Sequence, residues 1–113
     1  MKFLIRLILS ALAVMITAWL LPGVEVSSFF VAIVVAAVLA VLNMIVKPIL
    51  VILTIPITII TLGIFLLVIN AVIILMADSL IQGFTVYGFW WALLFSLILA
   101  LFNSFLGGLN SEN

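Results

Sequence analysis

The 113-residue sequence contains no cysteine and no histidine, and it has only three basic and three acidic residues. Without cysteine the chain has no disulfide framework, no thiolate metal site and no thiol nucleophile. Without histidine it has no imidazole base, imidazole metal ligand or histidine proton relay. The few basic residues form no positively charged surface for nucleic acid and no polybasic patch for anionic lipid. We therefore expect no nucleic-acid partner.

Apolar residues dominate the composition. They make up 71% of the chain, charged residues make up 5%, and the mean hydropathy is +1.80. A soluble domain has about 45–50% apolar and about 25% charged residues, so this composition predicts an integral membrane protein in contact with the lipid bilayer. The sequence shows no metal-ligand cluster, phosphate loop, nucleophile elbow or carboxylate pair. We therefore expect neither a cofactor nor an enzymatic function.

Four stretches are long and apolar enough to cross a bilayer, whose hydrocarbon core of about 30 Å takes roughly 20 helical residues. They are Phe3–Leu21, Phe29–Val46, about Ile57–Leu80 and Phe89–Leu106. The predicted fold class is therefore all-α, a four-helix transmembrane bundle. The polar, glycine-rich residues 107–113 are predicted to form a flexible tail.

The linker between the second and third stretches, residues 47–62, is interrupted by proline. Pro48 and Pro56 each remove a helix hydrogen bond, and the Thr58 and Thr61 hydroxyls can bond the freed carbonyls. Three interpretations are compatible with this pattern. The second helix continues past Pro48 with a kink and turns near Pro56, which begins the third helix. Alternatively the linker dips into the bilayer as a re-entrant hairpin, or it crosses and makes a fifth span.

The sequence matches itself at an offset of 60 residues without gaps. The identical pairs are Leu7/Leu67, Ala11/Ala71, Leu20/Leu80, Gly23/Gly83, Val26/Val86, Phe29/Phe89, Ala32/Ala92, Leu39/Leu99, Ala40/Ala100 and Asn43/Asn103. We interpret them as two tandem two-helix repeats, at about 3–46 and 63–106, within one transmembrane domain of residues 1–106. If the linker does not cross, the repeats share one orientation about an axis along the membrane normal; if it crosses, they are inverted.

Each repeat carries a stripe of small residues that ends in an asparagine. The members are Ala32, Ala36, Ala40 and Asn43 in the first repeat, and Ala92, Ser96, Ala100 and Asn103 in the second. Their spacing keeps each stripe on one helical face. Small residues let helices approach closely in lipid, and an amide can hydrogen-bond across them. The stripes predict either a tight contact between the second and fourth helices or a polar lining for a pore or an oligomer.

Three polar residues stand out within or beside the predicted spans. Asn70 is the deepest polar group and shares a helical face with Gly63, so its amide needs a partner. Asp78 lies in the last turn of the third helix, where it is either a solvated interfacial acid or a functional one. Lys47 follows the second span as a snorkelling anchor or a functional cation. Asp78 and Lys47 are expected on opposite sides of the membrane, so they do not form a catalytic pair.

The placement of charge predicts the orientation of the chain. Lys2, Arg6 and Lys47 mark one side of the membrane, and Glu25 and Asp78 mark the other. The positive-inside rule then places both termini in the cytoplasm. Aromatic residues near the opposite ends of the spans are expected to form an interfacial belt. These are Trp19, Tyr87, Trp90 and Trp91.

A family resemblance rests on a series of short motifs along the chain. They are Leu42-Asn43-Met44-Ile45-Val46-Lys47-Pro48-Ile49-Leu50, Pro56-Ile57-Thr58, Thr61-Leu62-Gly63-Ile64-Phe65, Asn70 and Gly83-Phe84. From about residue 3 to residue 106 the sequence resembles phage holin family 4, superfamily IV, which comprises small YvlD-like bacterial membrane proteins of unknown function. The resemblance implies an inner-membrane protein of about four spans.

The holin resemblance implies assembly into membrane lesions, and a pore-forming homo-oligomer is the first functional hypothesis. The tail departs from the usual holin pattern because it has no basic residue and Glu112 is its only charge. This departure weakens the lytic interpretation and leaves two alternatives. One is a structural or regulatory subunit of the cell envelope that acts through an unidentified membrane-protein partner. The other is a small channel or transporter lined by Thr58, Thr61 and Asn70.

Overall fold

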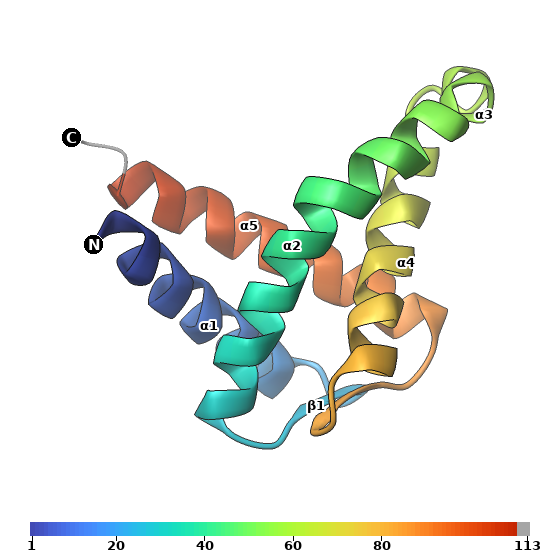
Figure 1. Ribbon diagram of the computed structural model, residues 1–113. Coiled ribbons are helices and arrows are strands. Elements are labelled where there is room, and N and C mark those ends of the chain that lie inside the picture. The colour runs from blue at the N-terminus through green and yellow to red at the C-terminus, as the bar shows by residue number, and fades with distance from the viewer. Residues whose placement is uncertain (111–113) are drawn as a thin grey trace.

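The computed structural model describes the backbone of residues 1–110 and the side chains of residues 1–106. Its elements follow in the order α1 (Lys2–Leu20), β1 (Val24–Val26), α2 (Phe29–Leu53), α3 (Ile55–Ile60), α4 (Phe65–Leu80), β2 (Phe84–Val86) and α5 (Phe89–Asn110) (Figure 1). Among the described residues, α1, α2 and α5 are long and apolar enough to span a membrane. The 16-residue helix α4 is also apolar but measures only about 24 Å at 1.5 Å per residue.

The four long helices form a ring. Helix α1 packs against α2, α2 against α4, α4 against α5, and α5 against α1. Across the ring, no Cα atoms of α1 and α4, or of α2 and α5, come within 8 Å of each other among the described residues. The predicted tight contact between the second and fourth helices, here α2 and α5, is therefore wrong, because these helices lie diagonally opposite each other.

A two-stranded antiparallel ribbon closes one end of the ring. Glu25 pairs with Thr85 at its centre, and the flanking pairs are Val24 with Val86 and Val26 with Phe84. Two backbone hydrogen bonds extend it: the Ser27 N–H donates to the Gly83 carbonyl and the Tyr87 N–H to the Gly23 carbonyl, both at 2.9 Å. Both the termini and the α3 hairpin lie away from the ribbon, with the start of α1 and the end of α5 at the left of the view and α3 at the upper right (Figure 1).

The linker comes nearest to the first of its three predicted geometries, although Pro56 begins a separate short helix and not the third span. Helix α2 continues through Pro48 to Leu53, well beyond the predicted end at Val46. The Thr54 hydroxyl then donates to the Leu50 carbonyl at 2.7 Å, and Pro56 lies in the first turn of α3. A proline is tolerated in a helix's first turn because the N–H it lacks has no helical acceptor there.

A left-handed turn separates α3 from α4. Leu62 and Gly63 have φ angles of 58° and 90°. The Gly63 N–H donates to the Thr58 carbonyl at 2.8 Å and the Leu62 N–H to the Ile59 carbonyl at 3.1 Å, the pattern that ends a helix. The Thr61 hydroxyl accepts the Phe65 N–H at 3.2 Å as α4 begins. The prediction of one helix from about Ile57 to Leu80 is therefore wrong at its start.

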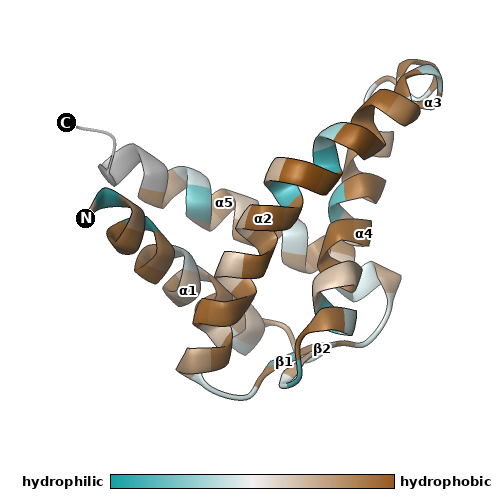
Figure 2. Cartoon of the chain, in the orientation of Figure 1, coloured by the Kyte–Doolittle hydropathy of each residue, from teal (hydrophilic) through white to brown (hydrophobic). Residues whose placement is uncertain are grey.

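The outer surface of the fold is apolar, as contact with lipid requires. Large side chains such as Phe30, Ile60 and Leu62 are 72%, 80% and 91% exposed. In Figure 2 the helices are mostly brown, with teal confined to a few bands and to the ends. Helix α5 reaches Asn110, inside the stretch predicted as a flexible tail, and residues 111–113 lie outside the described part of the chain.

One aromatic residue predicted for the interfacial belt packs against the loop before β1. Trp19 and Trp90 are 84% and 74% exposed, as a belt requires. Trp91 is only half-buried at the surface, and its ring lies directly over the backbone of Gly23, where a β-carbon has no room. Gly23 thus allows the start of α5 to close against the loop before β1.

Candidate functional site

A polar cavity lies inside the ring, in the half that carries the termini. It has two lobes, of about 120 and 160 Å³. The first is lined by Ser10, Val14, Ala36, Leu39, Ala40, Asn43, Leu99 and Asn103. The second is lined by Leu39, Asn43, Lys47, Asn70, Ile73, Ile74, Ser96, Leu99, Ala100 and Asn103. The lobes share four residues, and we call them together the vestibule.

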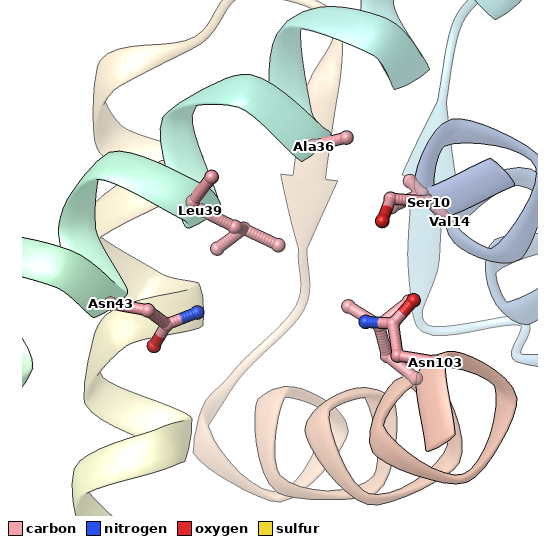
Figure 3. A pocket seen from close by; sticks show the side chains of 8 residues that line it. Ser10, Val14, Ala36, Leu39, Asn43 and Asn103 are labelled. Atoms are coloured by element: carbon pink, nitrogen blue, oxygen red, sulfur yellow. The ribbon is translucent and has the colours of Figure 1, made fainter. Parts of the chain in front are cut away.

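Besides Ser96 on α5, each helix of the ring contributes one uncharged polar residue to the vestibule. These are Ser10 from α1, Asn43 from α2, Asn70 from α4 and Asn103 from α5. Figure 3 shows Asn43 and Asn103 on facing helices, with Ser10 directed into the space beside Asn103. The four residues form two pairs that are 60 positions apart in the sequence, Ser10 with Asn70 and Asn43 with Asn103.

The amides in the vestibule retain their hydrogen-bonding capacity. Within the described residues, the side chains of Asn43, Asn70 and Asn103 make no hydrogen bond to protein, whereas the Ser96 hydroxyl donates to the Leu93 carbonyl at 2.8 Å. Asn43 and Asn103 are exposed and Asn70 is half-buried, so the vestibule is open at its mouth. These amides are therefore suited to contact water or a polar solute.

Among the residues whose side chains the structure describes, Lys47 is the only charged one that lines the vestibule. Its side chain is half-buried, and its place within α2, six residues before the end of that helix, does not match an anchor at a helix terminus. The described part of the chain offers it no ion-pair partner, since Glu25 and Asp78 lie at the ribbon end of the fold. A cationic group thus faces a cavity to which residues 1–106 contribute no carboxylate.

The two acids support the ribbon instead. The carboxylate Oδ2 of Asp78 accepts the backbone N–H of Val86 at 3.2 Å, which ties the end of α4 to β2. The Tyr87 hydroxyl donates to Glu25 Oε1 at 3.3 Å. The charge of Glu25, followed by this hydrogen bond and by slight desolvation, raises the pKa of Tyr87 above its ordinary value. The Asp78 carboxylate is thus engaged by the backbone of the ribbon.

Apolar side chains close the vestibule toward the ribbon. Leu39 and Leu99 line its base and are both buried. One turn earlier in each helix, nearer the ribbon, Val35 and Phe95 are fully buried. The ring centroids of Phe95 and Phe84 lie 5.7 Å apart. We call Leu39, Leu99, Val35, Phe95 and Phe84 the floor. The vestibule is thus closed at the floor and lies toward the end that carries the termini.

The structure brings together most of the candidate residues predicted on the helices. Asn43, Asn70, Asn103, Lys47, Ala36, Ala40, Ser96 and Ala100 line the vestibule. Ala32 and Ala92 are fully buried below the floor. The linker residues Pro56, Thr58, Thr61 and Gly63 lie in the hairpin away from the vestibule, and Pro48 lies one residue beyond Lys47 in α2. The Thr58 hydroxyl is buried there without a hydrogen-bond partner among the described residues.

Sequence reasoning missed Ser10. A single serine in an apolar helix carries no signal of its own, but Ser10 corresponds to Asn70 at the 60-residue offset. Because serine and asparagine differ, this pair is not among the identical residues at that offset. The described residues hold no group of three or more His, Cys, Asp or Glu side chains suited to a metal ion.

Two curated relatives resemble the chain along most of its length. The uncharacterized membrane protein YvlD of Bacillus subtilis is 35% identical over 103 residues, which cover 90% of this chain and 87% of the relative. An uncharacterized protein of Streptomyces coelicolor is 40% identical over 110 residues, which cover 88% of each chain. No solved structure matches the fold.

A family model described as "Mycobacterial 4 TMS phage holin, superfamily IV" matches residues 1–105. The three long apolar helices and the shorter apolar helix α4 are consistent with the four transmembrane segments in that description. The motifs that carried the resemblance, from Asn43-Met44-Ile45-Val46-Lys47-Pro48 to Gly83-Phe84, all fall within the matched residues. The chain therefore belongs to the four-span phage holin family of superfamily IV.

Proposed function

We propose that each chain of this holin-family protein forms a gated path for small ions, and that the vestibule is its entrance. The observation that carries the proposal is the set of four polar side chains, one from each helix of the ring, around one cavity. Polar backbone and side-chain groups at membrane depth are found where they line a water-filled cavity or are buried in protein. The buried floor acts as the gate, which must move for an ion to pass.

The residues that line the vestibule form pairs 60 positions apart, which supports a chain built from two repeats. We infer that residues 1–106 form one domain of two tandem repeats, related by an axis along the membrane normal. The ends of α1 and α4, Leu20 and Leu80, and the starts of α2 and α5, Phe29 and Phe89, differ by 60 positions. The ribbon ends in two equivalent hydrogen bonds, from Ser27 to Gly83 and from Tyr87 to Gly23. The two donors are 60 positions apart and so are the two acceptors, which is the reciprocal pattern of a two-fold contact.

The charges support an orientation. Lys2 and Arg6 near the N-terminus and Lys47 in the second half of α2 lie away from the ribbon, whereas Glu25 and Asp78 lie at the ribbon end. By the positive-inside rule we place the protein in the bacterial inner membrane with both termini, the α3 hairpin and the vestibule toward the cytoplasm. The hairpin's exposed apolar side chains and lack of charge favour its lying in the cytoplasmic interface of the bilayer.

This path differs from the lesion expected of a holin oligomer. A lumen between chains needs polar or small-residue faces left over after each chain folds, but Asn43, Asn103 and Ser96 face the vestibule of their own chain. We propose that a homo-oligomer, where it forms, contains one path in each chain. The alternative of a structural or regulatory subunit predicts no current from the protein alone.

Ionic current through planar bilayers tests the proposed path. We expect brief openings from the wild-type protein and a strongly reduced open-channel current from Asn70→Leu, because leucine removes a polar group and occupies its lobe. Ser104→Leu is the matched control, since Ser104 is exposed on α5 and lines neither lobe. Each variant is first shown to be helical and monodisperse in detergent. The absence of wild-type current over a wide range of protein-to-lipid ratios, or an equal loss in both variants, would contradict the path.

A further inference from the structure

We propose that the vestibule is an anion-binding site, in which the Lys47 ammonium supplies the counter-charge and the surrounding amides supply hydrogen bonds. The ligand class is a small oxyanion of the phosphate type, taken either from water or from a lipid head group. This inference deepens the proposed function, because it names what the entrance of the path selects.

The charge distribution is the first argument. Within residues 1–106, Lys47 is the one charged residue that lines the cavity, and no carboxylate lines either lobe. Charged side chains within membrane proteins pair with an opposite charge, because the low dielectric makes an isolated ion costly. Glu25 and Asp78 are engaged at the ribbon end by Tyr87 and by the Val86 N–H. The described residues therefore leave the counter-charge of Lys47 to a mobile anion.

The supply of donors is the second argument. The second lobe holds Lys47 together with Asn43, Asn70 and Asn103, whose side chains make no hydrogen bond to protein in the described part of the chain. Each amide NH₂ group offers two donors and the ammonium offers three, so several donors can converge on one oxyanion. A metal cation finds no such match, because the same lobe presents a positive charge and no carboxylate.

Size is the third argument. The second lobe has a volume of about 160 Å³ and is continuous with the first through Leu39, Asn43, Leu99 and Asn103. Each water occupies about 30 Å³ of liquid volume, so the lobe accommodates an ion of phosphate size together with water. Low-dielectric walls around one sign of charge also concentrate the field and raise the local concentration of the opposite ion.

Thermal unfolding of the purified protein tests the site without requiring current. One arm adds inorganic phosphate in detergent at constant ionic strength, and the other adds phosphatidylglycerol in place of a zwitterionic lipid. A ligand that binds only the folded state raises the Tm with the logarithm of its concentration. We expect such a rise for wild type and for Lys47→Arg, and its loss in Lys47→Met. Arg6→Met is the control, because Arg6 is exposed and lines neither lobe.

The two titrations distinguish a free anion from a lipid head group. Together with the bilayer current, they also distinguish the anion site from the proposed path. A Lys47-dependent rise with phosphate identifies a free anion, and one confined to phosphatidylglycerol identifies a lipid head group. Equal shifts in wild type and Lys47→Met in both arms would overturn the site. A Lys47-dependent rise in Tm without bilayer current would uphold the anion site and contradict the path. Bilayer current without that rise would uphold the path and contradict the anion site.

Discussion

Replacing Phe95 with alanine is expected to increase the current through bilayers carrying the protein and to lower its free energy of unfolding by about 3–5 kcal/mol. Phe95 is fully buried in the floor and packs on Phe84 with 5.7 Å between ring centroids. Removing the ring leaves a cavity below the vestibule that the surrounding side chains fill only in part. The barrier between the vestibule and the ribbon end is then thinner. Planar-bilayer current and thermal unfolding in detergent measure the two effects.

Phe105→Ala is the matched control for this prediction. Phe105 belongs to the same helix but is 65% exposed on the outer surface, so its loss opens nothing inside the ring. We expect that variant to have the current of wild type. The milder Phe95→Val, which introduces the residue found at the corresponding position Val35, keeps the test valid if the alanine variant does not fold. A folded Phe95 variant whose current equals that of wild type would show that the floor is not the gate.

Gly23→Ala is expected to destabilise the fold by about 1–3 kcal/mol, the usual range for overpacking a well-packed site. A β-carbon at position 23 meets the indole ring of Trp91, so either the loop before β1 or the start of α5 must shift. Both elements hold the ribbon, because the Gly23 carbonyl accepts the Tyr87 N–H. A fall in the Tm of the detergent-purified protein measures the effect.

A second substitution tests the cause of that effect. Trp91 corresponds to Val31 at the 60-residue offset, and Val31 is the side chain nearest to Gly83 after Ser27. In Gly23→Ala/Trp91→Val the new methyl group has room, so we expect the double variant to lose less stability than the sum of its two single variants. Additive losses would show that the alanine acts through something other than the indole ring.

The membrane class and the approximate number of helices could be predicted from sequence because they depend on composition and on long apolar stretches. The ends of the helices around the linker could not. Pro48 indicates a break, yet α2 continues through it to Leu53, because the hydrogen bonds of the adjacent turns hold the helix across the one that proline cannot make. The actual break at Leu62 and Gly63 depends on two left-handed residues, and leucine gives no indication of such a conformation.

The candidate site was predictable in its residues but not in its geometry. Asn43 and Asn103 stand out as amides at the ends of small-residue stripes, and that pattern is typical of helices in contact. The ring places α2 and α5 diagonally, so the stripes flank a cavity, a three-dimensional arrangement that spacing along one helix does not specify. The packing of Trp91 on Gly23 was likewise hidden, because a tryptophan near a helix end is equally typical of an interfacial belt.

The central claim is that the vestibule is open to water from the side that carries the termini. The chain has no cysteine, so single-cysteine variants give an unambiguous reaction with a membrane-impermeant maleimide. In vesicles that expose this side, we predict that Asn103→Cys reacts, because a thiol needs water to ionise and meet the reagent. Leu101→Cys, two residues earlier and 72% exposed on the outer surface, is predicted to stay unreactive in lipid. An unreactive Asn103→Cys beside a reactive Leu101→Cys would contradict the claim.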